Sequence, residues 1–464
     1  MYAQQRRLLS AGQERLWFLQ QFNAASGAGG LYNEHASVRF DGPLNVPAMH
    51  QALGEVARRH ESLRWVIESE RGSYVAVARD EPFERCVLTF DLEAIADPAE
   101  RERTYRRCAT EVAREPFDLA TGPLFRIALF RLSKRELAMA VVMHHIITDA
   151  WSMHILVEDL CNAYSSISVG RPIAGGEVDY SDAPDTGLEH GDAATLEQLT
   201  YWTTKLANAP PSVSLPTHRP RPDPRTFAGA KQYFTLHDEA IAPMRARMRE
   251  ERVTRFILLL ALWNAYLGAN AGRRDLVVGV TTAGRDRNEA ERRLGFFANT
   301  VALRTEFSVS DSFRQYLRQV RAVALEGLDH QQIPFERVVQ ELRLPRSANR
   351  QPLFEVMFVY VNTAVLDLAI PGVNVRLTPE DITLGLTKFD LVLCFWERGA
   401  GIQGLIDYST ELYDGPEIGA HIARFQTFAA RAVADPDRAI DELVPIERVP
   451  RRVIEDLRSA SLAG

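Results

Sequence analysis

The residues best suited to do chemistry lie at positions 144–152, which read HHIITDAWS. A neutral histidine can accept a proton from an attacking amine, hydroxyl or thiol, so this stretch suits acyl transfer assisted by a general base. The sequence contains no GxSxG elbow, and no cysteine lies beside the two histidines to act as a nucleophile. We therefore expect direct attack on an acyl group, without a covalent acyl-enzyme.

A metal site fits the same stretch poorly. Side chains alternate along a strand, so His144 and His145 would point to opposite faces and could not easily share one ion. The sequence also has no HExxH or CxxC pattern. For one of the two histidines the better interpretation is structural, namely a buried ring that is satisfied by hydrogen bonds. Asp149 is expected to turn back and hold the loop through an arginine or through backbone amides.

The neighbouring elements explain how these residues would be positioned. The apolar run ELAMAVVM at 136–143 predicts a buried strand, and residues 153–164 place apolar side chains at helical spacing. Asp149 or Ser152 is the expected N-cap of that helix. The histidines then lie at the carboxyl end of a strand, on a loop that leads to a helix N-terminus, where reactive groups are often found.

Composition limits the classes of function. A chain of 464 residues, 46% hydrophobic and 25% charged, is typical of a soluble globular protein of about two or three domains. Its net charge of -7 gives no reason to expect a nucleic-acid partner. The four cysteines are scattered, which fits the reducing cytoplasm. No signal peptide is evident, and the most apolar run, at 256–263, is too short to span a membrane and predicts a buried helix.

Strands and helices alternate along the chain, which predicts an α/β (α+β layered) fold. An opening helix is expected behind Ser10, with Leu16, Phe18, Leu19 and Phe22 forming its apolar stripe. A stretch rich in Gly, Asp and Pro from 170 to 225 indicates either a connection between two lobes of similar content or a segment that wraps the surface. The remaining elements are expected as strands at 34–42, 122–132, 231–237, 275–282, 354–362, 388–397 and 404–410, and as helices at 46–59, 98–116, 197–206, 239–250, 256–267, 312–328 and 416–433.

Six stretches spread over nearly the whole chain carry a family resemblance. The stretch MHHIITDAWS at 143–152 resembles the HHxxxDG active-site signature of condensation domains of nonribosomal peptide synthetases. Five further stretches resemble other motifs of that family, in the family's own order. They are LSAGQERLWFLQQ at 9–21, RRHESLRWVI at 58–67, LGFFANTVALR at 294–304, HQQIPFERVV at 330–339 and RSANRQPLFEVMF at 346–358.

Two positions depart from the family pattern. Ala150 stands where the family has glycine, and an alanine there would be strained if the backbone adopted a positive φ. The family's YxDFAxW motif is reduced to YSDAPDT at 180–186. Epimerisation domains share the HHxxxD core, but the GFFANT and HQQIPFE stretches resemble condensation domains more closely.

The resemblance implies a fold of two lobes, each similar to chloramphenicol acetyltransferase, arranged as a V with the active site in a central tunnel. We expect an N-terminal lobe at 1–176, which carries HHIITDA, and a C-terminal lobe at 177–464. The loop before Gly295 and the stretch at 377–388 are the expected segments of the C-terminal lobe that cross to close the tunnel.

The resemblance also implies roles for individual residues. His145 is the expected catalytic residue, as a general base or as a group that stabilises the charged tetrahedral species, and His144 is expected to brace the loop. Asp149 is expected to be structural and paired with an arginine. The candidate arginines are Arg59, Arg64 and Arg285, in that order. The backbone amides near Trp151 and Ser152, which follow Ala150, are candidates for an oxyanion site. Asn299 is expected to support the tunnel, and Gln13 and Arg15 are expected to anchor the opening helix.

The reaction implied by the resemblance uses substrates that arrive on the phosphopantetheine arms of carrier proteins. The amine of an acceptor attacks the thioester carbonyl of an acyl or peptidyl donor and forms an amide, while the chain itself binds no cofactor and no metal. One alternative is a free-standing enzyme that forms an ester or amide with a small-molecule acceptor. Another is a catalytically silent module that docks carrier proteins or tailoring enzymes. We expect a cytoplasmic monomer of natural-product or antibiotic biosynthesis, with no nucleic-acid or membrane partner.

Overall fold

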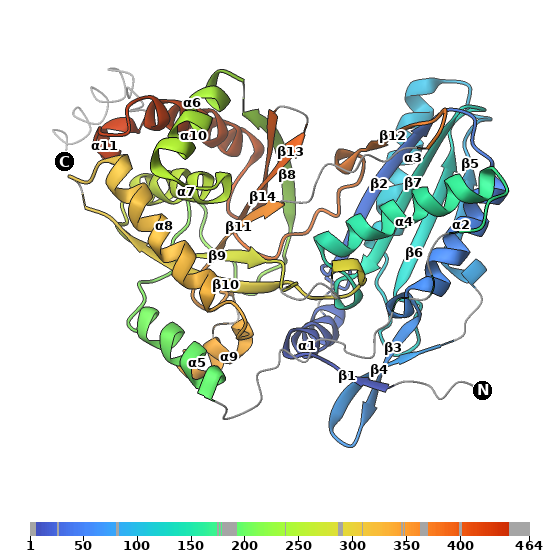
Figure 1. Cartoon of the computed structure of the whole chain (residues 1–464), viewed down its shortest axis with the longest axis horizontal. Coiled ribbons are helices and arrows are strands. Elements are labelled where there is room, and N and C mark those ends of the chain that lie inside the picture. The colour runs from blue at the N-terminus through green and yellow to red at the C-terminus, as the bar shows by residue number, and fades with distance from the viewer. Residues whose placement is uncertain are drawn as a thin grey trace, which may run out of the picture.

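The computed structural model describes residues 6–25, 27–79, 83–173, 176, 178, 193–236, 238–285, 291–308, 310–344, 347, 349–361, 370–398 and 401–444. Figure 1 shows them as two lobes, each with a β-sheet and packed helices. The mixed α/β, two-lobed architecture confirms the expected fold class. The expected lobe boundary at 176/177 adjoins a stretch that is mostly outside the described residues and stays a prediction; the eroded motif at 180–186 also lies outside them.

The first lobe is built on a five-stranded sheet in the order β12-β2-β7-β6-β5. Its central strand, β7 (Glu136–His144), is buried from its second residue onward and runs antiparallel to both β2 (Asn33–Asp41) and β6 (Phe125–Arg131). The predicted strand at 136–143 is therefore confirmed. The other elements of this lobe are β5 (Val87–Asp91), helices α2 (Val46–Arg59), α3 (Pro98–Arg114) and α4 (Ala150–Ser168), 3₁₀ turns η1 (Glu61–Arg64), η2 (Phe83–Cys86) and η3 (His145–Ile147), and a small sheet of β1 (Arg6–Leu8), β4 (Ser73–Ala78) and β3 (Trp65–Glu70).

The second lobe contains a six-stranded sheet in the order β10-β9-β11-β13-β14-β8. Its helix α7 (Arg255–Ala271) is buried continuously from Ile257 to Gly268, which confirms the predicted buried helix. The sheet consists of β8 (Gly229–Leu236), β9 (Asp275–Thr282), β10 (Asn299–Glu306), β11 (Val356–Val361), β13 (Leu391–Arg398) and β14 (Gly401–Ser409). The other helices are α5 (Ala193–Lys205), α6 (Asp238–Glu251), α8 (Phe313–Asp329), α9 (Phe335–Leu342), α10 (Gly415–Ala434) and α11 (Ile440–Leu443).

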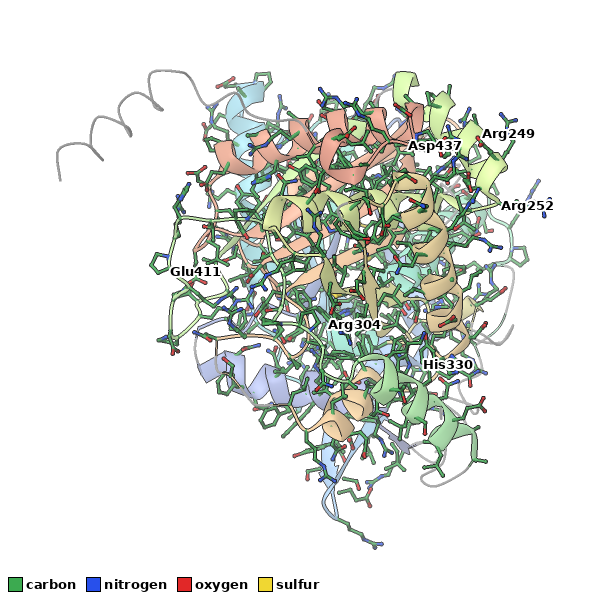
Figure 2. All side chains as sticks on the ribbon, turned by 90° about the vertical axis from the view of Figure 1, so that its left-hand side faces the viewer. Arg249, Arg252, Arg304, His330, Glu411 and Asp437 are labelled. Carbon is green, nitrogen blue, oxygen red and sulfur yellow. The ribbon has the colours of Figure 1, made fainter. Side chains whose placement is uncertain are left out.

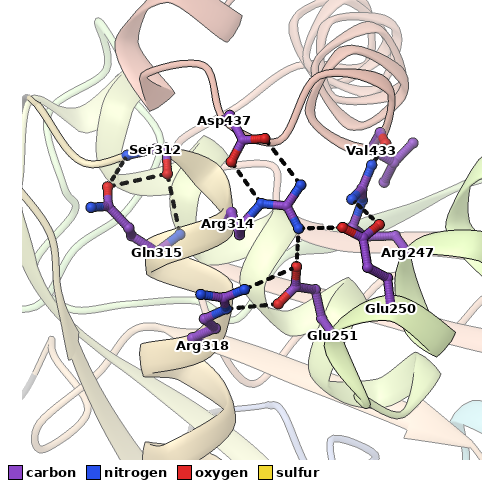
Figure 3. Close-up of polar contacts among 9 residues, drawn as sticks. All are labelled: Arg247, Glu250, Glu251, Ser312, Arg314, Gln315, Arg318, Val433 and Asp437. Atoms are coloured by element: carbon purple, nitrogen blue, oxygen red, sulfur yellow. Dashed lines mark hydrogen bonds and ion pairs between the residues drawn. The ribbon is translucent and has the colours of Figure 1, made fainter.

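Ion pairs tie the helices of the second lobe to one another. Figure 3 shows Arg314 on α8 bonded through Nε to Asp437 at 2.6 Å and through Nη1 to Glu250 on α6 at 2.6 Å. Figure 2 labels Arg304 on β10, which pairs with Asp275 on β9 at 2.7 Å. These contacts link α6, α8 and the segment after α10.

Two segments of the second lobe reach the first lobe (Figure 1). Strand β12 (Asn374–Leu377) adds to the first sheet, antiparallel to β2, and Asp381 just after it pairs with Arg39 Nε at 2.8 Å. The crossing loop, which joins β9 to β10, contacts the start of α4 through its described residues Glu291 and Gly295. Both segments that were expected to cross therefore contact the first lobe, and the later contact begins at β12. That they close a tunnel stays a prediction.

Helix α1 (Ala11–Ala25) starts as predicted, because the Ser10 hydroxyl caps the amide of Gln13 at 3.3 Å. Its expected apolar stripe is wrong in part: Phe18 is 63% exposed and Phe22 is 64% exposed. The buried face instead carries polar side chains beside Leu16, and these are Gln13, Gln20 and Asn23. The polar residues occupy the interior because they supply hydrogen bonds there, which leaves the two phenylalanines on the open side.

Candidate active site

His144 ends β7 and is fully buried. Its Nδ1 accepts the amide proton of Ile146 at 3.1 Å, so Nε2 carries the ring proton and donates to Gln20 Oε1 at 3.3 Å. Burial, together with the nearby charges of His145 and Lys388, lowers the pKa of His144 to about 3. Both ring nitrogens are engaged and the ring stays neutral, so His144 is suited to hold the turn and not to move protons.

His145 follows in the short turn η3 and has a different environment. Its Nδ1–H donates to the carbonyl oxygen of Thr148 at 2.7 Å, which leaves Nε2 as a proton acceptor. Burial lowers the pKa of His145 below its ordinary value of 6.5, although the carboxylate of Glu34 acts in the opposite direction. The side chain is still 22% exposed. His145 is therefore a neutral, accessible base at neutral pH.

Helix α1 fixes the turn that carries the two histidines. Gln13 Nε2 donates to the carbonyl of Ile146 at 2.9 Å, and Gln20 accepts the proton of His144 while donating to the carbonyl of Gly29 at 2.9 Å. The sequence assigned Gln13 only to anchoring the helix and missed Gln20. The signal that could have found both is two glutamines spaced by two helical turns, since that spacing places them on one face.

Asp149 caps α4 and holds the second lobe at the same time. Its Oδ1 accepts the amide proton of Ser152 at 2.7 Å and a proton of Arg285 at 3.0 Å, and its Oδ2 accepts the amide proton of Phe297 at 3.1 Å. The side chains of Asp149 and Arg285 are only 4% and 2% exposed. The carboxylate is thus occupied by donors from α4 and from the crossing loop, as a structural residue would be.

The crossing loop is fastened to the first turn of α4. The Ser152 hydroxyl donates to the carbonyl of Gly295 at 2.8 Å and accepts the amide proton of the same residue at 3.0 Å. The Trp151 indole donates to the carbonyl of Glu291 at 3.0 Å. Gly284, at the start of the loop, has φ +62°, and a Cβ there would lie 1.9 Å from the carbonyl oxygen of Phe297, so only glycine fits.

One residue of this loop forms a wall of the site. The ring of Phe296 meets the ring of His145 edge to face, with the ring centroids 5.0 Å apart. The second lobe therefore contributes directly to the surroundings of the histidine.

Two of the sequence expectations about partners need correction. Of the three candidate arginines, the last one, Arg285, pairs with Asp149, whereas the first choice, Arg59, pairs with Asp159 at 3.6 Å. Arg64 lies in η1 and is not among the described contacts of Asp149. The cause is the crossing loop, which brings Arg285 across from the second lobe and over the N-terminus of α4.

Two expectations about the start of α4 also change. The amide of Ser152 is not available for an oxyanion, because it donates to the Asp149 carboxylate. Ala150 begins the helix with its side chain exposed, and it is not one of the described residues with positive φ. An alanine therefore fits this backbone without strain. The assignment of the Trp151 amide stays a prediction.

Asn299 braces the site from the second lobe. Its Nδ2 donates to the carbonyls of Gln331 and Ile333, both at 2.7 Å, and its Oδ1 accepts the amide proton of Phe335 at 3.2 Å. These bonds fix the entry to α9. The next residue on α9 then pairs with α1, because Glu336 bonds to Arg15 at 2.9 Å. Arg15, expected only to anchor the opening helix, thus forms a further bridge between the lobes, whereas the tunnel support expected of Asn299 stays a prediction.

Two charged residues beside His145 were missed by the sequence analysis. Glu34 Oε1 on β2 lies 3.7 Å from His145 Nε2 and 2.7 Å from Lys388 Nζ of the second lobe. Desolvation would raise the pKa of Glu34, but the attraction of Lys388 and His145 outweighs it and holds the pKa well below its ordinary value. No sequence signal marks either residue, since each reads as an ordinary surface charge.

Glu34 and His145 are surrounded by protein but remain partly exposed. Burial is the largest influence on the pKa of both groups. Their side chains are nevertheless 38% and 22% exposed, so water reaches both. The expected tunnel stays a prediction.

The described residues contain no cluster of His, Cys, Asp or Glu that could hold a metal ion. None of the helices in the described part of the chain is long and apolar enough to cross a membrane.

Comparison with known proteins defines the class. The condensation-domain family model matches residues 3–452, so the chain belongs to the condensation-domain family. The chain is 36% identical over 446 residues to a linear gramicidin synthase of Brevibacillus parabrevis, covering 95% of this chain and 9% of that protein. It is 33% identical over 463 residues to phosphinothricin tripeptide synthetase PhsC of Streptomyces viridochromogenes, covering 97% of this chain and 41% of that protein. The chain thus spans less than half the length of these relatives.

Solved structures share the fold. A four-domain nonribosomal peptide synthetase bound to AMP and glycine gives a TM-score of 0.84 at 21% identity, over 96% of this chain and 34% of that one. The X-domain from teicoplanin biosynthesis gives a TM-score of 0.80 at 24% identity, over 96% of this chain and 99% of that one. The first condensation domain of the calcium-dependent antibiotic synthetase, in complex with a substrate analogue, gives a TM-score of 0.78 at 22% identity, over 94% of this chain and 99% of that one. The expected family, nonribosomal peptide synthetase condensation domains, is confirmed.

Proposed function

We propose that this chain forms an amide bond between an acyl or aminoacyl thioester donor and the amine of an acceptor, with both substrates delivered on phosphopantetheine arms of carrier proteins. The observation that carries the proposal is the state of His145. Its Nδ1–H is held by Thr148, and its Nε2 is a neutral acceptor on a partly exposed side chain that is flanked by Glu34 of the first lobe and Phe296 of the second. A group in that state can take a proton from an attacking amine.

The proton balance of the reaction suits such a base. An α-amine has an ordinary pKa of about 8, so part of the acceptor is already neutral near pH 7 and a weak base suffices. The amine attacks the thioester carbonyl, a C–N bond forms, and the C–S bond breaks. His145 Nε2 takes a proton from the nitrogen and returns it to the departing thiolate, and the Thr148 carbonyl stabilises the transient imidazolium through Nδ1–H.

The exposed side of α1 is our candidate contact for a carrier protein. Phe18 and Phe22 lie four positions apart, are 63% and 64% exposed, and belong to the same helix whose buried glutamines hold the histidine turn. A carrier bound on this face would therefore contact the helix that supports the histidine turn. Exposed aromatic residues without a structural reason to be exposed are typical of binding surfaces.

The test supplies acyl-loaded carriers with amine and alcohol acceptors and follows the products by mass spectrometry. Wild type and His218→Ala, which removes an exposed histidine, should form amide, while His145→Ala should not. Equal product from wild type and His145→Ala would remove His145 from catalysis. Ester in place of amide would favour the alternative with a hydroxyl acceptor, and tight carrier binding without any product would favour the docking module.

A further inference from the structure

Glu34 and His145 present two hydrogen-bond acceptors to the same space. Because Nδ1–H of His145 is donated to Thr148, its Nε2 carries a lone pair, and it faces the Glu34 carboxylate. The 3.7 Å between Nε2 and Glu34 Oε1 exceeds the length of a hydrogen bond, which is about 2.7–3.2 Å. Two acceptors at this separation are not bonded to each other, so both can be satisfied together by one group that brings several N–H donors.

The carboxylate also has capacity for a ligand. Lys388 Nζ bonds to Oε1 at 2.7 Å, while none of the described residues donates to Oε2. The side chain is 38% exposed, so a substrate can reach it. Lys388 itself lies over the ring of Tyr32, with Nζ 5.0 Å from the ring centroid. Oε1, which accepts from the lysine, is also the oxygen that lies 3.7 Å from His145 Nε2, so Oε2 of the same carboxylate is the oxygen left for a further donor.

We propose that Glu34 and His145 together form a cradle for the ammonium group of the acceptor, which makes the domain select amine over hydroxyl acceptors. This inference rests on the proposed condensation function and specifies its acceptor class. Glu34 Oε2 accepts one N–H of the ammonium and His145 Nε2 accepts another. A hydroxyl acceptor has a single proton to donate and no charge, so it leaves one of the two acceptors unsatisfied.

The step is balanced. The bound ammonium first loses one proton to solvent and becomes a neutral amine, which attacks the donor carbonyl. A C–N bond forms and the C–S bond breaks. His145 Nε2 takes the second proton from the nitrogen and returns it to the departing thiolate. Glu34 stays ionised throughout, so its role is to bind and orient the acceptor nitrogen.

The experiment measures binding, so it does not depend on turnover. The probes are the non-hydrolysable amide analogues of alanyl-pantetheine and lactyl-pantetheine, which differ only in carrying an ammonium or a hydroxyl group. Titration calorimetry on wild type should show about tenfold or more tighter binding of the alanyl probe, the size expected for one hydrogen bond to a charged group. Glu34→Gln should bring the two affinities close together, and Glu111→Gln, which changes an exposed carboxylate on α3, should keep the preference.

A second variant keeps the inference testable if Glu34→Gln folds poorly. Lys388→Met removes the cation that competes for Glu34 and should strengthen the preference for the alanyl probe. The inference is overturned if wild type binds both probes equally or binds neither, if the preference survives in Glu34→Gln, or if Lys388→Met loses it. A wild type that prefers the alanyl probe but forms no product with any loaded carrier would instead refute the proposed function.

Discussion

The buried pair of Asp149 and Arg285 gives the sharpest prediction about how the site is held together. Asp149→Asn keeps the shape of the side chain and its ability to cap α4 but removes the charge opposite Arg285, which is only 2% exposed. Removing one partner of a buried ion pair leaves the other charge uncompensated, which costs about 3–5 kcal/mol. Arg285→Met should cost toward the lower end of that range, because the carboxylate keeps the amides of Ser152 and Phe297 as donors.

The double variant tests whether the stability losses of the single variants come from the interaction between Asp149 and Arg285. In Asp149→Asn/Arg285→Met no uncompensated charge remains, so its loss of stability should be smaller than the sum of the two single losses by about 2 kcal/mol or more. The control is Arg107→Gln on α3, whose pair with Glu111 is 63% and 61% exposed and should contribute about 0.5 kcal/mol or less.

The assay is urea unfolding, followed both by tryptophan fluorescence and by circular dichroism, since a chain of two lobes need not unfold in one step. Hydrogen exchange locates the effect. The amide of Phe297 donates to Asp149, and that of Gly295 donates to Ser152, so both should exchange faster in the single variants. Strictly additive losses in the double variant, or unchanged exchange at these two amides, would refute the idea that the pair locks the crossing loop onto α4.

Two further predictions concern protons and partners. Because the reaction needs neutral His145, whose pKa lies below 6.5, the acid limb of the kcat/KM profile should lie below that pH. Glu34→Gln removes a negative charge that raises the pKa of His145, so this variant should move the limb to lower pH. Lys388→Met removes a positive charge that lowers the pKa of His145, so this variant should move the limb to higher pH. Shifts in the same direction in a pH–rate profile would contradict the assignment. Phe18→Ser/Phe22→Ser should leave the melting temperature nearly unchanged, since both rings are exposed, but should raise KM for carrier-delivered substrates and not for the same groups on free pantetheine. Equal effects on both kinds of substrate would argue against carrier docking on α1.

Local pattern in the sequence was sufficient for the elements around the histidines. The run at 136–143 is apolar and short enough to predict a buried strand, and β7 is that strand. Asp149 is a strong N-cap residue at the right distance from a helical run, and α4 begins directly after it. The strand and the helix cap depend only on residues that are close together in the chain, so one sequence is enough to predict them.

Contacts between distant residues were not accessible in the same way. Asp149 and Arg285 are 136 positions apart, and which arginine reaches the carboxylate depends on the path of a loop. The helical spacing of Phe18 and Phe22 shows that they share a face, but spacing does not tell whether protein covers that face. Glu34 lies in a strand that alternates polar and apolar residues, where a charge reads as facing solvent.

The residues of this site divide by the kind of contact they make. Those in the recognisable stretches, such as Gln13, Asp149 and Asn299, bond mainly to backbone atoms and fix where the histidine turn and the crossing loop lie. Glu34 and Lys388 bond to each other and face the space beside His145 Nε2. Substituting the first kind moves the backbone and damages any reaction, whereas substituting the second kind leaves the backbone in place and changes the charges beside the base. If the proposed cradle is correct, the choice of acceptor can therefore change at positions 34 and 388 while the HHxxxD stretch and its supports stay the same.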